Sequence, residues 1–348
     1  MVKMETDTGS KGPDAECSPH LLDLGQLPGV FHYEEGFSRP DWTVVRKAIQ
    51  QTVSPENLSE AWSEAAMQWV RQLRSDLGGG YTVRSSVEFL LLSTLDARAS
   101  RELLAFAEAT LGRIVQVLKE AAWKPGYGKH VILLFAEIDD YYQYVSFFCT
   151  EGEHPASGGC LIHKDYVHIA LPHLDGRNIR RTLVHELVHN TVVHLPLPLW
   201  LNEGLAVLFD RTAADAPYPM LDGELRDRHM AFWNPGNIQK FWAGTSFGEP
   251  GDSNELSYSL AEIIVNLLLS EHGSEFGVFL TEAKWADAGQ TAALDCLGAN
   301  LGDVMGTFLG QGDWRPYRKV MVECWNAVKK PSGNDERATS RTRLLHPL

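Results

Sequence analysis

Cysteine is scarce in this chain, and the sequence shows neither the long apolar run of a membrane-spanning helix nor a secretory signal. The 348 residues include five cysteines, widely spaced and without a Cys-x-x-Cys pair, which argues against a disulfide scaffold or a cysteine-built zinc site. No apolar run approaches the roughly 20 residues of a membrane-spanning helix. Met1 to His20 is polar and lacks the apolar stretch of a secretory signal. We therefore expect a cytoplasmic protein that does not enter a membrane.

Basic residues are also in deficit. Lys and Arg number 31 against 45 Asp and Glu, which gives a formal net charge of −14. Nucleic-acid binding requires a basic surface, so neither DNA nor RNA is an expected partner. Hydrophobic residues make up 44% of the chain and charged residues 22%, which is typical of a globular protein with a buried core.

The two ends of the chain differ in amino-acid composition from its middle. Residues 1–20 are predicted to be a disordered leader, and residues 331–348 a disordered polar tail. Residues 21–80 form a predicted helical N-terminal segment, with helical spacing of apolar residues over 40–77 and a break at Gly78-Gly79-Gly80. This N-terminal part could act as a regulatory cap or as an arm that binds a partner.

The middle, residues 81–330, is predicted to be one domain that begins with strands and continues mostly as helices. Strands are expected at 81–94, 130–136 and 160–171, and helices at 97–122, 178–194, 200–210 and 256–270. Alternating apolar and polar residues in the third strand indicate a sheet edge with one face exposed. The glycine- and proline-rich stretch 212–253 is predicted to be irregular loops. This order favours an α+β fold with a small sheet in front and helices behind it.

One short pattern carries chemistry. Residues 185–189 read His-Glu-Leu-Val-His. On a helix that turns about 100° per residue, His185 and His189 lie about 40° apart and one turn along the same face, so both imidazoles can reach one metal ion. Glu186 stands beside them, where it can reach a metal-bound water. Ile179, Leu183 and Leu187 form a separate apolar face, which leaves the histidine face free of the core.

A catalytic zinc usually has three protein ligands and a water, so a third ligand is expected. Glu203 is the best candidate, because 13 residues with two prolines separate it from His189 and can turn the chain back. Gly204 beside it removes side-chain bulk where two helices pack closely. His194 is a weaker candidate, since it lies about 140° around the helix from His189. A third histidine of the metzincin kind is absent, because Val192 and Leu195 occupy the positions where that pattern has Gly and His.

The two motifs together, His-Glu-Leu-Val-His and Trp200-Leu201-Asn202-Glu203-Gly204-Leu205-Ala206, resemble those of the gluzincin zinc metallopeptidases. The similarity is greatest to the peptidase MA-like group and extends over roughly residues 81–325. It implies a zincin-like fold: a small mixed sheet with a backing helix, an active-site helix and a mainly helical C-terminal subdomain.

The resemblance also implies a site. His185, His189 and Glu203 would bind one Zn²⁺, and Glu186 would be the catalytic base. Tyr258, near the start of the next long helix, would stabilise the oxyanion. The chain departs from the thermolysin-like pattern at Val207, where that pattern has an Asp. Asp210 lies three residues further on, so the partner that would orient a zinc-bound histidine is unassigned.

The expected function is a zinc-dependent peptidase that acts on a peptide or protein substrate. An extended substrate could pair with the exposed edge of the 160–171 strand. His163, His168 and His173 near that strand are expected to lie on the surface. Two alternatives share these motifs: a catalytically silent zincin-fold protein that binds or regulates a partner, and a zinc hydrolase of a non-peptide amide or ester.

Overall fold

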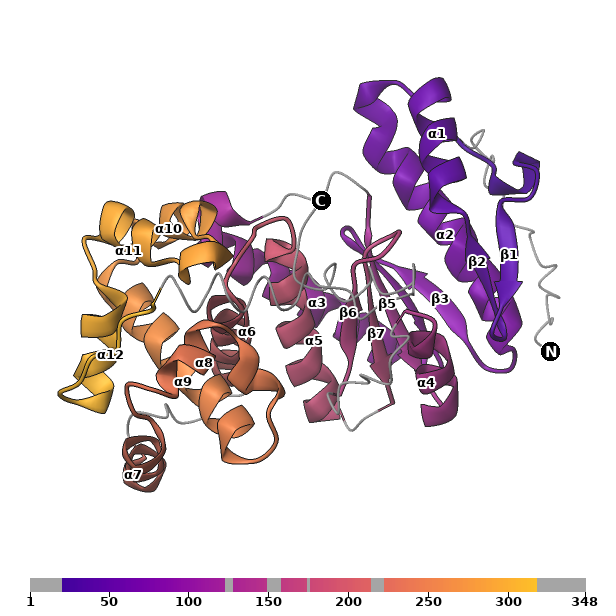
Figure 1. Ribbon diagram of the computed structural model, residues 1–348. Coiled ribbons are helices and arrows are strands. Elements are labelled where there is room, and N and C mark those ends of the chain that lie inside the picture. Colours follow the sequence, from indigo (N-terminus) through magenta and orange to yellow (C-terminus); the bar gives the residue numbers. More distant parts are fainter. Residues whose placement is uncertain (1–20, 123–127, 149–157, 174–175, 214–221, 318–348) are drawn as a thin grey trace, which may run out of the picture.

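The structure is a computed structural model that describes residues 21–122, 128–148, 158–173, 176–213 and 222–317. Its elements form a mixed α+β fold, as the sequence predicted (Figure 1). The predicted leader (1–20) and tail (331–348) lie outside the described residues. Within the part of the chain that is described, no helix is both long and apolar enough to cross a membrane.

A five-stranded mixed sheet lies at the centre of the molecule. Its strands are β3 (Thr82–Ser85), β4 (Phe89–Ser93), β5 (His130–Phe135), β6 (Cys160–Ile162) and β7 (His168–Pro172). They lie in the order β3-β4-β5-β7-β6. The inner strands β4, β5 and β7 are parallel, whereas β3 and β6 pair antiparallel to their neighbours. A small mixed sheet was the expectation.

Two of the predicted strands are each a pair of strands. The 81–94 segment folds back between β3 and β4 at a turn in which the Ser86 N–H donates to the Phe89 carbonyl at 2.9 Å. Val87 in this turn is apolar but 77% exposed. Neither glycine nor proline stands beside it, so the sequence pattern of the segment did not indicate a turn. The 160–171 segment likewise divides into β6 and β7. The prediction of one half-exposed edge strand there is wrong, because β7 is interior and buried on both faces.

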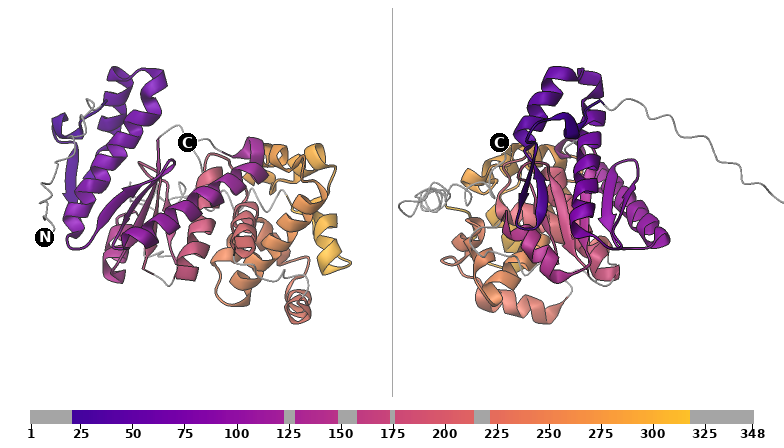
Figure 2. Two further views of the ribbon diagram at one scale, coloured as in Figure 1. Left: turned by 180° about the vertical axis from the view of Figure 1, so that it is seen from behind. Right: turned by 90° about the vertical axis from the view of Figure 1, so that its right-hand side faces the viewer.

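Helices cover both faces of the sheet (Figure 2). Alternate strand residues point to opposite faces, as the pleat of a strand requires. One face packs against α3 (Ala97–Leu118) and α5 (Gly176–Val192), and contributes Phe89, Leu91 and Ile132 to the core there. The other face packs against α2 (Leu58–Leu77) and α4 (Ile138–Ser146). A short 3-10 turn, η3 (Lys119–Ala121), follows α3.

The N-terminal segment packs on the second of these faces. The predicted helices are present as α1 (Trp42–Thr52) and α2. Three elements were not predicted: a hairpin of β1 (Phe31–Glu34) and β2 (Phe37–Pro40), and the 3-10 turns η1 (Leu24–Gln26) and η2 (Pro55–Asn57). Trp42, Trp62 and Trp69 surround the ring of Tyr166, with ring centroids 5.0 to 6.3 Å from it. Residues 21–80 therefore share a core with the sheet.

All the described elements after β7 are helical, which agrees with the predicted helical C-terminal part. They are α5, α6 (Leu199–Ala213), α7 (Gly223–Phe232), α8 (Ile238–Trp242), η5 (Thr245–Gly248), α9 (Asp252–Glu271), α10 (Phe276–Glu282), η6 (Trp285–Asp287), α11 (Gln290–Leu297) and α12 (Leu301–Leu309). The prediction of irregular loops over 212–253 is wrong for α7, α8 and η5. These elements are short, and glycines and prolines between them masked any helical period.

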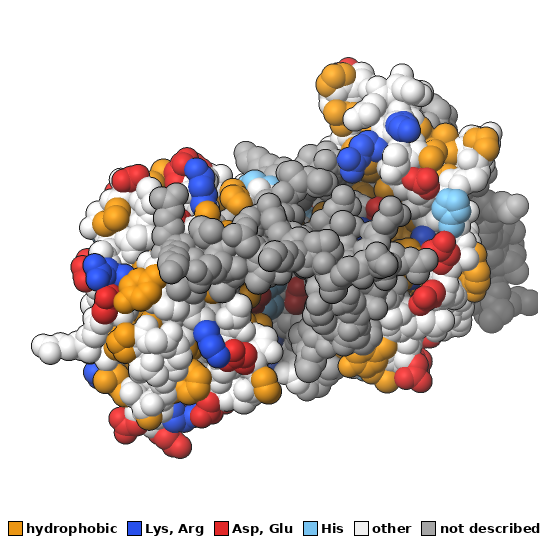
Figure 3. Space-filling model, in the orientation of Figure 1, with side chains coloured by type: hydrophobic (Ala, Val, Ile, Leu, Met, Phe, Trp, Pro, Cys, Tyr) orange, Lys and Arg blue, Asp and Glu red, His pale blue; other side chains and the backbone are white. Residues whose placement is uncertain are grey.

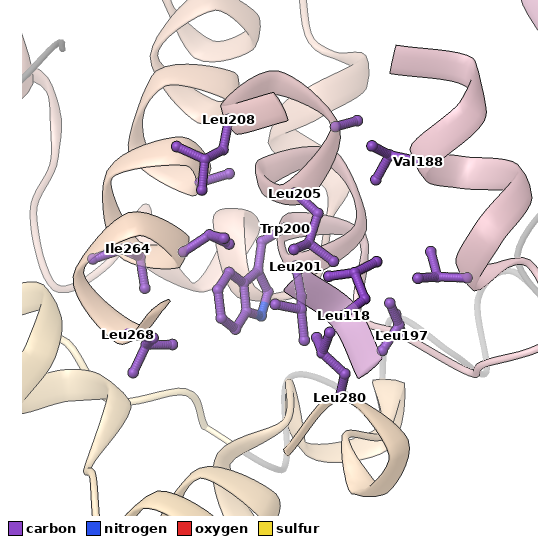
Figure 4. Close-up of a cluster of buried hydrophobic side chains, with 14 of the residues drawn as sticks. Leu118, Val188, Leu197, Trp200, Leu201, Leu205, Leu208, Ile264, Leu268 and Leu280 are labelled. Carbon is purple, nitrogen blue, oxygen red and sulfur yellow. The ribbon is translucent and has the colours of Figure 1, made fainter. Parts of the chain in front are cut away.

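Helix α6 is the centre of this helical part and packs between α5 and α9. Figure 4 shows the Trp200 side chain on the side of α6 that faces Leu268, whereas Leu205 lies toward Val188 of α5. The Trp200 indole is fully buried and donates to the Ala288 carbonyl at 3.0 Å. These contacts fix α6 relative to both neighbouring helices.

Gly204 lies where α6 and α9 approach each other closely. A Cβ at this position would lie 2.6 Å from the Ala261 carbonyl oxygen and 2.7 Å from Cγ2 of Val265. Ordinary contacts of this kind begin at about 3.4 Å, so a side chain cannot fit unless the helices separate. The expectation that Gly204 allows two helices to pack closely is confirmed, and α9 is the partner helix.

Candidate metal centre

Helix α5 presents its two histidines on a face that does not form the core. Its predicted apolar residues Ile179, Leu183 and Leu187 are buried against the sheet and α3. The side chains of His185 and His189 keep 23% and 14% of their surface exposed. Their ring centroids lie 4.7 Å apart, as expected of residues one turn apart on one helix face.

Glu203 reaches this histidine pair from α6. The chain turns after α5, and the N–H groups of Leu201 and Asn202 both donate to the Pro198 carbonyl to start the new helix. Glu203 Oε2 lies 3.5 Å from Nε2 of His185 and 3.6 Å from Nε2 of His189. The structure therefore brings together the three residues that the sequence singled out as possible ligands. Figure 3 shows histidine and acidic side chains side by side near the middle of this face of the molecule.

The three side chains fit a divalent cation. One ligand atom from each of His185, His189 and Glu203 lies within 4.8 Å of the other two. Glu203 Oε2 is buried and has no hydrogen-bond partner among the described residues, although a buried carboxylate oxygen normally has one. Two imidazole nitrogens and a carboxylate oxygen are the donor set of many catalytic zinc sites. A cation between them would give this carboxylate oxygen the close partner that it lacks.

The charges within the cluster support one another. Burial lowers the pKa of His185, but its contact with Glu203 and the charges of Glu186, Glu203 and Asp210 outweigh that effect, and the net pKa is raised. Burial acts to raise the pKa of Glu203, but the adjacent His189 and His185 bring it below its ordinary value. Glu203 is therefore an anion at neutral pH, as a ligand must be.

Glu186 and Tyr258 lie within electrostatic reach of this cluster. Glu186 follows His185 on α5 and is 5% exposed. Tyr258 lies in the second turn of α9, with its ring edge-on to Phe247 at 5.1 Å. Burial raises the pKa of Tyr258, and the charges of Glu203 and then Glu186 raise it further. The phenol is therefore protonated at neutral pH and can donate a hydrogen bond.

Two neighbours of the cluster were missed by sequence reasoning. Asn202 Oδ1 lies 3.0 Å from Nδ1 of His189 and can accept a hydrogen bond from it, which leaves Nε2 facing Glu203. Its position directly before Glu203 was the available signal. The second is Tyr141 of α4, which lies within electrostatic reach of Glu186. Burial raises the pKa of Tyr141 most, and Cys160 and the charge of Glu186 raise it further. No spacing in the sequence connects Tyr141 with Glu186.

The other histidines have different surroundings. Among the described residues, the cluster contains neither His194 nor the histidines near β6 and β7. His173 is exposed, as predicted, and His163 is partly buried. The prediction that His168 lies on the surface is wrong, because it is 2% exposed and lies 2.7 Å from the Tyr144 hydroxyl.

Strand β6 is the edge of the sheet next to α5. It pairs only with β7 within the described part of the sheet. A Cβ on Gly159, just before β6, would lie 2.9 Å from Cγ2 of Thr182. This places the start of β6 against α5, one turn before His185. The edge strand of the prediction is therefore limited to Cys160–Ile162.

No protein-family model matches the chain, and a search of curated proteins finds no similar sequence.

Proposed function

We propose that this protein is a zinc-dependent peptidase with a zincin-like fold. The observation that carries the proposal is the convergence of His185, His189 and Glu203, with ligand atoms within 4.8 Å of one another and one buried carboxylate oxygen that has no hydrogen bond among the described residues. Sequence motif and geometry agree on the same three residues. The motif resemblance to gluzincin peptidases supplies the reaction class.

The chemistry follows from the residues around this cluster. A zinc ion held by His185, His189 and Glu203 would polarise the scissile carbonyl and make water acidic enough to lose a proton near neutral pH. Glu186 takes a proton from the attacking water and delivers it to the leaving amine. Tyr258, with its raised pKa, donates a hydrogen bond to the oxygen that becomes negative in the transition state. Asn202 holds His189 in the orientation that points Nε2 toward Glu203.

The proposed substrate is an extended peptide. Among the described strands, β6 lies at the edge of the sheet next to β7, and it lies beside α5. A peptide that added a strand along this edge of the sheet would run past the metal cluster. A peptide or protein segment is the ligand class that such an edge recognises.

One variant separates the metal site from the chemistry. Purified protein is expected to contain about one zinc per chain. Glu186→Ala should keep the metal and lose peptide cleavage by about 10²-fold or more, because Glu186 transfers the proton and binds no metal. The matched variant Glu203→Ala should lose the metal itself. A broad peptide library assayed by mass spectrometry gives the readout, and undiminished cleavage by Glu186→Ala would refute the assigned role.

A negative result would also be informative. Zinc-loaded protein that cleaves no peptide in the library would contradict the proposed activity and favour a protein that binds a partner or hydrolyses a different amide or ester. Protein that binds no zinc at all would contradict the metal centre.

A further inference from the structure

Two adjacent residues near the end of α6 form ion pairs in opposite directions. The Asp210 carboxylate accepts two hydrogen bonds from Arg181 of α5, from Nε at 2.9 Å and from Nη2 at 3.0 Å. The next residue, Arg211, pairs instead with Glu262 of α9. This turn of α6 is therefore tied to both helices that pack against it.

The Arg181–Asp210 pair and the metal cluster both lie where α5 packs against α6. Arg181 precedes His185 by four residues, so the two side chains lie on one face of α5. Asp210 follows Glu203 by seven residues, which is about two turns along one face of α6. The charge of Asp210 also acts on His185. The pair therefore joins the same faces of α5 and α6 that carry the candidate ligands.

The candidate ligands differ in what holds them. His189 has Asn202 behind its ring. For the ring of His185, the described residues provide only the contact with Glu203 among polar partners. The position of His185 relative to Glu203 then depends on how closely this part of α5 approaches α6, and the bidentate pair with Asp210 spans that gap.

We propose that Arg181 and Asp210 are positioning residues of the metal centre: together they hold α5 against α6 so that His185 and Glu203 can bind one cation. The proposal rests on the proposed function, because it requires the metal site to be real. Asp210 is 13% exposed and Arg181 is 50% exposed at the side chain. A bidentate geometry gives such a partly buried pair directional strength that a single contact lacks.

A charge argument makes the opposite prediction for one variant. If Arg181 acted on the cation only through its positive charge, Arg181→Met would remove a repulsion and strengthen cation binding. If Arg181 positions the ligands, the same variant weakens binding. The direction of the change therefore distinguishes the two roles.

The experiment is a titration of the full chain with Co²⁺, followed by its visible absorption, and with Zn²⁺ in competition. Arg181→Met and Asp210→Asn should each weaken binding by about tenfold, the lower end of the effect of removing a residue that orients a metal ligand. The double variant should be no weaker than the weaker single variant, because the two residues act as a unit. Arg181→Lys, which keeps the charge without the fork of two donors, should fall between wild type and Arg181→Met.

The other ion pair supplies a matched control. Arg211→Met combined with Glu262→Gln removes the link from the same turn of α6 to α9, which contributes no ligand to the cluster. Glu262 is fully buried, so this double variant should lower the melting temperature while cation affinity stays within about twofold of wild type. Weakening as large as that of Arg181→Met would show general destabilisation and overturn the proposal.

The remaining outcomes also decide. Unchanged or tighter Co²⁺ binding by Arg181→Met, or additive losses in the double variant, overturns the positioning role and leaves the proposed peptidase intact. Wild-type protein that binds no stoichiometric Co²⁺ or Zn²⁺ overturns the metal centre itself.

Discussion

The close approach of α6 to α9 at Gly204 predicts how an added methyl group changes stability. In Gly204→Ala the new Cβ would lie 2.6 Å from the Ala261 carbonyl oxygen. This is about 0.8 Å shorter than an ordinary contact of roughly 3.4 Å. The atom it meets is backbone, so the helices themselves must separate. Overpacking of this kind costs about 1–3 kcal/mol, and we expect the upper end of that range.

A second glycine isolates this cost from helix propensity. Gly112 lies in an exposed part of α3, and a Cβ there would have no neighbour within 4 Å. Replacing glycine by alanine inside a helix stabilises it by about 1 kcal/mol. Gly112→Ala should therefore raise the free energy of unfolding by about 1 kcal/mol. In Gly204→Ala the same gain in helix propensity is offset by an overpacking cost of about 3 kcal/mol, so the free energy of unfolding should fall by about 2 kcal/mol.

Urea unfolding and thermal unfolding, each followed by circular dichroism, measure both variants against wild type. At roughly 2–4 °C per kcal/mol, the melting temperatures should shift in opposite directions. Separation of the helices also moves the neighbouring Glu203, so Gly204→Ala should bind Co²⁺ more weakly as well. Equal stabilisation by both substitutions would refute the reasoning, because it would mean that α6 and α9 do not approach as closely as this geometry requires.

Two further predictions concern histidines. Asn202→Ala removes the acceptor at 3.0 Å from Nδ1 of His189 and should weaken Zn²⁺ binding about 10- to 100-fold in a competition titration; unchanged affinity would contradict the orienting role. Burial lowers the pKa of His130, His168 and His229 from 6.5 to about 4, so below pH 6.5 the unfolded chain takes up protons that the native chain does not. The free energy of unfolding should fall as the pH drops from 6.5 to 4, by up to about 3 kcal/mol for each histidine, and a flat or rising urea midpoint over that interval would be evidence against it.

Local sequence determined the elements with a strong period. α3, α5 and α9 were predicted from apolar spacing because a long amphipathic helix repeats its signal over several turns. The pair His185 and His189 was predictable for the same reason, because residues four positions apart on one helix share a face. The sequence also showed that Asp210 lies three residues beyond the position where the thermolysin-like pattern has an Asp. It did not identify the residue that Asp210 contacts.

These local patterns could not predict which segments pack against each other when they are far apart in the sequence. Whether the segment 160–171 is one strand or two depends on which neighbours it pairs with, and only the order β5-β7-β6 shows that β7 is interior. The short helices α7 and α8 carry too few turns for a period and are held by packing on α9 and α6. His168 was expected on the surface because alternation alone cannot reveal that helices cover both faces of its strand.

The amino-acid sequence by itself determined which residues could act as ligands and which helix holds two of them, because helical geometry relates residues a few positions apart. Only the tertiary structure decided that Glu203 reaches the histidines, that Asn202 stands behind His189, and that Arg181 pairs with Asp210. Each of these contacts crosses from α5 to α6. The distance between two helices is set by the side chains buried between them and by close approaches such as that at Gly204, and no spacing along a single helix encodes it.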